Sequence, residues 1–289
     1  MVAYNPKDWF SFIFRFHRSD TFRKLLPAMV GIGAYAALVA FLETGYWRLT
    51  EANQVKNLGL MHGTLGFVIS LLLVFRTNTA YERWWEGRKL WGDLVNTSRN
   101  MAIKLTAWSV PEKDRAYFAK MLALFARTLR DHLQGKRVDV AELKQHGLQA
   151  EFIRHAPSLV AGAMAKRATA LYRARKISGE QLIILNNELQ AFAAICGGCE
   201  RIKNTPIPYS YSAFIKKFIF IYIMTMPLGY AVSLGFIVAP VVVFIFYVLA
   251  SLELIAEEIE DPFGGDPNDL PLTRIVSEIQ NSTAEILQQ

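Results

Sequence analysis

The sequence is poor in charged residues and in cysteine. Charged residues make up 20% of the 289 positions and hydrophobic residues 52%, so the chain has more apolar surface than a typical soluble domain can bury. This balance indicates that lipid is part of the solvent of the protein. The only cysteines, Cys196 and Cys199, form a C-x-x-C pair. No second pair completes a zinc site, so we expect a structural role for both.

Catalytic patterns are also lacking. The five histidines do not pair at ligand spacing on one helix, and there is no glycine-rich phosphate loop, nucleophile elbow or H-E-x-x-H. We therefore expect no enzyme. The net charge of +7 comes without a basic stripe interleaved with aromatic residues, so we expect no nucleic-acid partner.

Apolar runs are what the sequence has in excess. Residues 218–252 carry no Lys, Arg, Asp, Glu or His, and this stretch is longer than the roughly 20 residues that one span needs. Gly235 and Pro240 interrupt it near its middle, which predicts two spans joined by a tight turn. Two shorter runs lie nearer the N-terminus. Four spans are thus predicted, at about 26–44, 58–76, 215–234 and 237–254.

Basic residues flank the predicted spans unevenly. Four lie within residues 15–24, before the first span, and four within 76–89, after the second, whereas the loop between these spans carries only Arg48 and Lys56. Because basic flanks stay in the cytoplasm, we predict a multi-pass protein of the inner (plasma) membrane with both termini cytoplasmic. His62, inside the second span, lines a polar path, pairs with a neighbour or reaches the headgroups near the outer end.

The region at about 77–210 is expected to be a cytoplasmic layer of helices within a single domain spanning residues 1–289. Apolar residues recur there at helical spacing, and Ser178 with Gln181 predicts a capping box. The segment 255–289 begins acidic and continues rich in proline and glycine. We expect it to be a tail that wraps a surface and does not form a core.

The chain reads FRTNTAYERWWEGR at residues 75–88, just past the second predicted span. This arrangement resembles the bestrophin family, in particular its short bacterial members, where an F-R-x-x-x-x-Y-x-R-W-W-E-x-R run follows the second transmembrane helix. Three other segments resemble the same family in order, at residues 16–19, 203–209 and 261–264. The resemblance implies an all-α integral membrane protein with four transmembrane helices per subunit, a cytoplasmic helical region and a homopentameric assembly around a pore.

The resemblance also places two constrictions of the pore. Three residues of the second helix form an apolar neck in the family, and they fall here on Phe67, Leu71 and Phe75. Residues four apart share a helical face, so five copies would give three apolar rings, which can gate by dewetting. From the residues alone, a lipid-facing or packing stripe is the alternative. The cytoplasmic aperture falls on Glu180, or on Ile177 if the placement shifts by a turn.

A Glu180 ring would favour cations, and the alternative for this residue is a solvated position that interacts with the helix dipole.

Animal bestrophins hold calcium after the fourth span, and Asp266 and Asp269 match the two carboxylate positions of that site. Oxygen-rich loops suit calcium, which is the one candidate cofactor, and the alternative is that both aspartates are turn residues, their more common role in a loop rich in proline and glycine.

The predicted function is passive conduction of small monovalent ions by a homopentamer in the lipid bilayer. Resemblance favours anions, chloride above all, and a sodium-selective channel is the alternative. A membrane sensor or scaffold that binds a cytoplasmic partner is the competing class. A secondary transporter is disfavoured because the spans show neither repeated halves nor charges at mid-membrane.

Overall fold

The computed structural model describes residues 21–49, 56–148 and 153–288. These residues form helices without any β-strand, as expected, and they fold into two compact units. The membrane unit holds Ile207–Glu260 and the described residues up to Glu82. The polar unit holds Arg83–Pro206 and the described residues from Asp261 on. The motif at 16–19 and several of the charges that predict topology lie outside the described residues.

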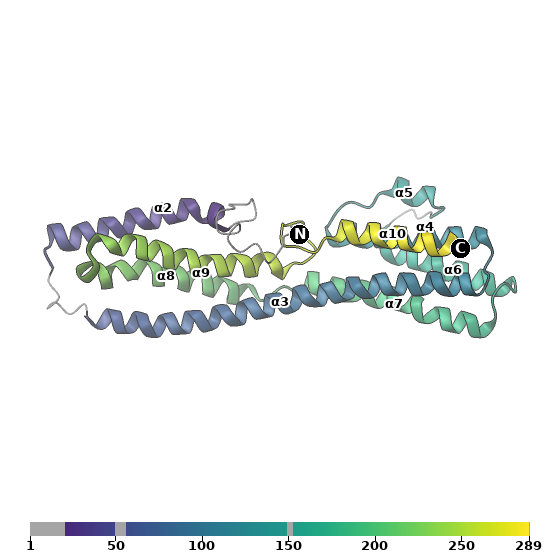
Figure 1. Ribbon diagram of the computed structural model, residues 1–289, viewed down its shortest axis with the longest axis horizontal. Helices are drawn as coiled ribbons and strands as arrows, with labels where there is room; N and C mark the ends of the chain where they lie inside the picture. Colours follow the sequence, from purple (N-terminus) through teal and green to yellow (C-terminus); the bar gives the residue numbers. More distant parts are fainter. Residues whose placement is uncertain (1–20, 50–55, 149–152, 289) are drawn as a thin grey trace. The chain divides into compact units, whose positions relative to one another are not determined.

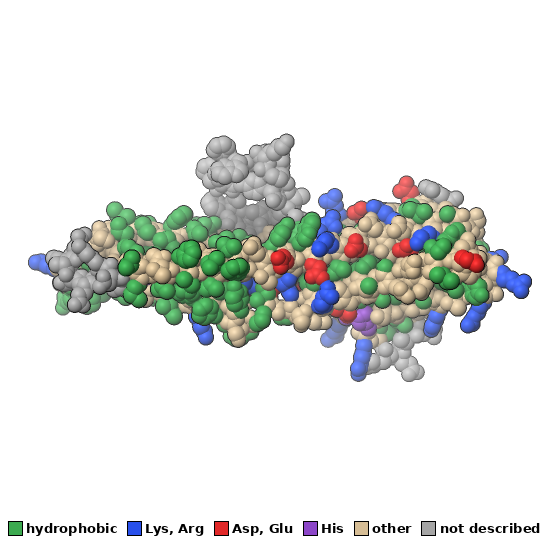
Figure 2. Space-filling view, turned by 90° about the horizontal axis from the view of Figure 1, so that it is seen from below, with side chains coloured by type: hydrophobic (Ala, Val, Ile, Leu, Met, Phe, Trp, Pro, Cys, Tyr) green, Lys and Arg blue, Asp and Glu red, His purple; other side chains and the backbone are tan. Residues whose placement is uncertain are grey.

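Four helices and two short helical turns build the membrane unit. They are α2 (Thr21–Ala40), η1 (Phe41–Tyr46), the first part of α3 (Lys56–Ala107), α8 (Tyr209–Leu234), η2 (Gly235–Ile237) and α9 (Val238–Glu260). Helix α2 packs against α8 and α9, which lie side by side (Figure 1). Hydrophobic side chains cover much of the visible surface of this unit (Figure 2).

The turn between α8 and α9 lies where the sequence predicts it. Gly235 ends α8 with a φ of +58°, a backbone conformation that residues with a Cβ rarely adopt. Pro240 falls in the first turn of α9, where a missing N–H costs little. The uncharged stretch 218–252 is therefore two helices, as predicted.

Four helical runs of the described chain are long and apolar enough to cross a membrane. They are Thr21–Tyr46, Gly59–Ala107, Gly179–Asn204 and Tyr209–Glu260. The last contains both α8 and α9, so the predicted spans are all represented. Gly179–Asn204 is helix α7 of the polar unit, which the sequence did not predict as a span. Its apolar stretch is 39% buried, against 17% to 22% in the other three runs, so packing within the unit covers a larger share of it.

The polar unit is built around α4. It contains the rest of α3, α4 (Glu112–Leu133), α5 (Val140–Gln145), α6 (Ala156–Arg173), α7 (Gly179–Asn204) and α10 (Leu272–Gln288). Helix α4 packs on α6, α7 and α10 (Figure 1). The fully buried rings of Phe125 and Phe192 meet edge to face with centroids 4.9 Å apart. The predicted capping box at Ser178 and Gln181 opens α7.

The C-terminal segment differs from the prediction. Helix α9 continues to Glu260, and α10 then buries Leu272, Ile275, Val276 and Ile279 in the core of the polar unit. The expectation that 255–289 wraps a surface without forming a core is therefore wrong for α10. Apolar residues at helical spacing line one face of α10, while the polar residues that suggested a surface tail lie between them.

Candidate pore-lining helix and the polar network behind it

Within the membrane unit, α3 has one buried and one exposed face. The buried face carries five side chains that are at most 2% exposed: His62, Ile69, Leu73, Arg76 and Ala80. Their spacing of seven, four, three and four residues is that of a single helical stripe. This stripe attaches α3 to the rest of the unit, so the opposite face is left open.

The three residues predicted for the neck lie on that open face. Phe67, Leu71 and Phe75 are 71%, 45% and 57% exposed. At 1.5 Å per residue they cover about 12 Å along the helix axis. Large apolar side chains so exposed are stable when lipid or another subunit replaces water around them. The structure thus brings the three together on one open face, and their role as a neck stays a prediction.

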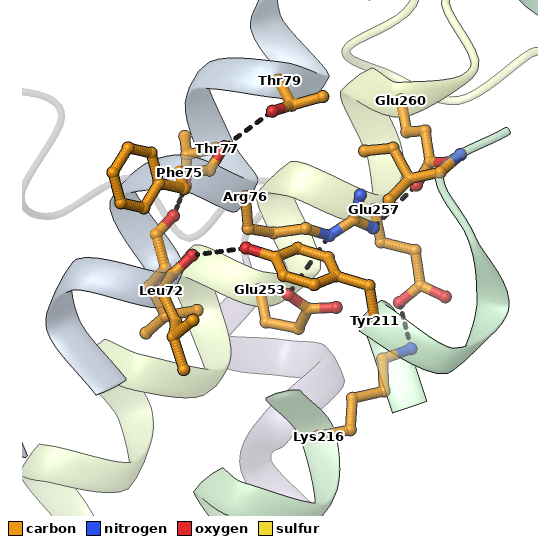
Figure 3. A network of polar contacts seen from close by, with 12 residues as sticks. Leu72, Phe75, Arg76, Thr77, Thr79, Tyr211, Lys216, Glu253, Glu257 and Glu260 are labelled. Atoms are coloured by element: carbon orange, nitrogen blue, oxygen red, sulfur yellow. Dashed lines mark hydrogen bonds and ion pairs between the residues drawn. The ribbon is translucent and has the colours of Figure 1, made fainter. Parts of the chain in front are cut away.

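Arg76 follows Phe75, the last residue of the predicted neck, and its side chain is buried on the face of α3 that packs on the unit. Its Nη2 donates to Glu260 Oε2 at 2.7 Å, and its Nε lies 3.5 Å from Glu253 Oε2 (Figure 3). Glu260 Oε1 in turn accepts the Ile207 N–H at 2.6 Å. Because a charge buried this deeply needs a partner, the arginine holds α3 against α9 directly behind Phe75.

Further polar contacts surround this ion pair. The Tyr211 hydroxyl donates to the Leu72 carbonyl at 3.2 Å, which fixes α8 to α3 one turn before Arg76 (Figure 3). Lys216 pairs with Glu257 at 2.9 Å between α8 and α9, with both side chains about half exposed. The open face of α3 is therefore backed by a polar network that joins three helices.

His62 occupies one of the positions considered from the sequence, that of an ionisable group paired with a neighbour. Its side chain is 2% exposed, and its Nε2 lies 3.0 Å from Thr225 Oγ1 on α8. The rings of Tyr222 and Tyr230 lie within 6 Å of the imidazole. The histidine is a packed and hydrogen-bonded group between α3 and α8, which agrees with the expectation that it pairs with a neighbour. Its burial leaves it away from the headgroups in this subunit.

The Arg-Trp-Trp-Glu motif secures the end of α7 within the polar unit. Arg83 donates to the carbonyls of Ile202 and Thr205, each at 2.5 Å, where the last carbonyls of a helix lack partners of their own. Glu86 pairs with Arg201 at 2.6 Å. These contacts join two segments that carry the family resemblance, residues 75–88 and 203–209.

The same motif also reaches the third of those segments. Trp84 Nε1 donates to the Asn268 carbonyl at 3.1 Å. A Cβ on Gly87 would lie 3.0 Å from the Pro262 ring and 3.1 Å from the Phe263 ring, so glycine allows this close packing. Phe263 is fully buried as a result. The sequence motifs thus describe one contact region of the polar unit.

Asp269 closes the loop that was expected to hold calcium. Its Oδ2 accepts the N–H groups of Gly265 and Asp266 at 2.5 and 2.6 Å, while its buried Oδ1 makes no hydrogen bond with the described residues. Burial raises the pKa of Asp269 to about 6, with the charges of Asp266 and Asp261 adding to the rise and the two backbone hydrogen bonds opposing it. An unbonded buried carboxylate oxygen beside two further aspartates fits a calcium ion.

The two candidates for the aperture differ in exposure. Ile177 is 4% exposed and belongs to the core of the polar unit, so it cannot line an opening. Glu180 is exposed in the first turn of α7, where Ser178 Oγ lies 2.6 Å from its Oε2. Ile183 and Ile184, which the sequence analysis did not single out, are 70% and 44% exposed on the next turn.

Cys196 and Cys199 are both free and buried. Gly198 between them lies against Leu90, where an added Cβ would come within 3.0 Å of the leucine methyl groups. Gly198 therefore lets α7 approach α3 closely, and the structural role of the two cysteines stays a prediction.

Comparisons with known proteins cover nearly the whole chain. Residues 1–285 match the family model described as Bacterial/Fungal Bestrophin protein. A voltage-dependent anion channel-forming protein of Mesorhizobium japonicum is 32% identical, over 98% of this chain and 91% of its own length. The voltage-dependent anion channel-forming protein YneE of Escherichia coli K12 is 30% identical, over 99% and 96%. A bestrophin homologue solved from Klebsiella pneumoniae superposes with a TM-score of 0.82 at 24% identity, over 92% of this chain and 99% of that one.

Proposed function

Because the chain belongs to the bacterial and fungal bestrophin family, we propose that it forms a homopentameric channel that passively conducts small monovalent anions, chloride among them. Family membership places the protein among ion channels and not among enzymes, and its long apolar helices belong to a multi-pass membrane protein. The observation that carries the proposal is the open apolar face of α3 at Phe67, Leu71 and Phe75.

The open face of α3 would line a pore if five subunits assemble with this face towards the axis. Five copies of α3 around an axis turn three exposed residues into three stacked rings. Apolar rings control conduction by shedding water when the passage is narrow. The edges of Phe67 and Phe75 carry the positive part of the ring quadrupole, which favours an anion, while Leu71 adds an uncharged constriction.

Glu180 is the feature that favours the alternative, a sodium-selective channel. Its carboxylate is exposed, and five copies at the cytoplasmic aperture would repel anions. We propose that the neck dominates selectivity and that Glu180 reduces anion passage at the aperture. The relatives named above are described as anion channel-forming proteins, which supports this order of importance.

The orientation and the cofactor complete the proposal. Arg23 and Lys24 before the first span and Arg83 and Arg88 after the second support a membrane protein with cytoplasmic termini. Calcium bound at Asp269, with Asp266 beside it, would neutralise the charge of the loop next to Phe263. The ion would supply electrostatic and structural support and no chemistry.

Ion flux from liposomes tests the channel against the scaffold alternative. Vesicles that contain the purified protein and a chloride gradient should release chloride when a potassium ionophore balances the charge. Mass measurement of the same sample in detergent should give five subunits. An intact oligomer that passes no ion would favour the sensor or scaffold instead.

A further inference from the structure

Three side chains from three helices of the polar unit meet at one point. His132 lies in the last turn of α4, His155 is the residue before α6, and Glu200 belongs to α7. Glu200 Oε1 lies 2.7 Å from the Nε2 atom of each histidine. The two imidazole rings are 4.6 Å apart between centroids. One carboxylate oxygen therefore bridges two imidazoles that are separate in sequence.

The geometry is close to that of a metal site. We propose that His132, His155 and Glu200 bind zinc or a divalent transition-metal ion of similar preference, with water as the fourth ligand. The three ligand atoms all lie within 4.8 Å of one another. With metal–ligand bonds of about 2.1 Å, the ligand atoms of a tetrahedral site lie about 3.4 Å apart, so each contact with Glu200 would lengthen by about 0.7 Å.

The exposure of the cluster suits an ion that enters from solvent. The side chains of His132, His155 and Glu200 are 28%, 32% and 28% exposed, which leaves room for a bound water. Two imidazoles and one carboxylate are a ligand set that zinc accepts with an open fourth position. Lys203 donates to the carbonyls of His132 and Leu133 and so holds the end of α4 at the site.

Metal binding would change one hydrogen bond of the present structure. His155 Nδ1 accepts the Ser158 N–H at 3.1 Å and so caps α6, which requires the ring proton to be on Nε2. A metal at Nε2 displaces that proton, and a neutral imidazole then carries its proton on Nδ1. Nδ1 can then no longer accept the Ser158 N–H, so the cap is lost in that state. Occupancy of the site and capping of α6 by His155 therefore exclude each other.

Cobalt is the probe for the first test, because tetrahedral Co²⁺ has intense visible bands. The full-length protein in detergent, first stripped with EDTA, should bind one Co²⁺ per subunit with such bands, and Zn²⁺ should abolish them. His132→Ala and Glu200→Gln should each weaken binding at least about 100-fold, because even outer-shell changes cost 10–100-fold. His146→Ala, outside the cluster but in the same unit, should leave the affinity unchanged. Equal affinity in all four proteins, or octahedral bands in the wild type, would overturn the proposal.

Hydrogen exchange gives a readout that needs no variant and no ion current. Zinc should speed exchange of the Ser158 amide, whose cap it removes. The Gln181 amide, capped by Ser178 at the start of α7, is the internal control and should exchange as before. Unchanged exchange at Ser158 under saturating zinc would contradict the assignment of His155 as a ligand.

Discussion

Arg76 and Glu260 form the ion pair, 2.7 Å between Nη2 and Oε2, that fixes α3 to α9 next to Phe75, the last residue of the proposed neck. The Arg76 side chain is 1% exposed, so water cannot replace a missing partner of the pair. Arg76→Met should therefore lower the free energy of unfolding by about 3–5 kcal/mol, since it leaves buried carboxylates without a cation. Denaturation in detergent, followed by circular dichroism, measures the loss.

Lys216 supplies the matched control for that substitution. It pairs with Glu257 in the same network, but both side chains are about half exposed. Lys216→Met should cost less than about 1 kcal/mol because solvent screens such pairs. Equal losses in the two variants would mean that Arg76 is not the anchor of α3.

Truncating the neck should increase conductance. Phe67→Ala and Leu71→Ala each remove an exposed apolar side chain from the open face of α3, which widens a ring and lowers the barrier to wetting. Single-channel recording should show currents several-fold larger than in the wild type. Phe244→Ala is the control, because Phe244 on α9 is 65% exposed but lies on another helix of the unit. A neck placed elsewhere would leave both α3 variants at wild-type conductance.

Removing the charge of Glu180 should favour chloride further. Glu180→Gln eliminates a ring of carboxylates at the proposed aperture without changing side-chain size. The reversal potential in a sodium chloride gradient should move towards the chloride equilibrium potential. Glu285→Gln, an exposed position on α10, should not move it. No movement in either variant would show that Glu180 lies away from the ion path.

Calcium should stabilise the protein through Asp269. A ligand that binds only the folded state adds about 2.7 kcal/mol when present at about 100 times its Kd, so calcium should raise the Tm. Asp269→Asn should abolish that rise because it removes the buried carboxylate, whereas Glu285→Gln should keep it. The same Tm rise in both variants would place the calcium effect outside this loop.

The calcium effect should also depend on pH. The pKa of Asp269 is raised to about 6, so the carboxyl group is protonated below that pH in the calcium-free protein. Calcium then has to displace a proton, and its effect on the Tm should shrink as the pH falls through about 6. An aspartate with an ordinary pKa of about 3.9 would keep its calcium affinity over this range. A pH-independent Tm rise would therefore contradict a role for Asp269.

Much of the membrane unit can be predicted from the sequence because each of its long helices is a continuous run of apolar residues. The uncharged stretch 218–252 and the glycine at its middle predict two helices and their turn. Helix α7 shows the limit of this reasoning. It is long and apolar, but part of its apolar face packs against α4 and α6. Composition alone does not separate a side chain that faces lipid from one that faces a core.

The polar unit depends on contacts between segments that are distant in the sequence, and such contacts are harder to predict. The metal-site cluster comes from three separate elements, because it consists of His132, His155 and Glu200. No residue spacing within a single helix therefore indicates it. The same holds for Ile177, whose burial no local pattern indicates. The Arg-Trp-Trp-Glu motif was found because it is continuous in sequence, although its contacts with Thr205 and Asn268 emerge only from the fold.

The reversal potential of the purified protein in a planar bilayer tests the central proposal most directly. With a sodium chloride gradient across the bilayer, an anion channel with an apolar aromatic neck should reverse close to the equilibrium potential of chloride. Substituting gluconate for chloride on one side should then reduce the current carried from that side. Reversal close to the equilibrium potential of sodium, unaffected by gluconate, would contradict the account.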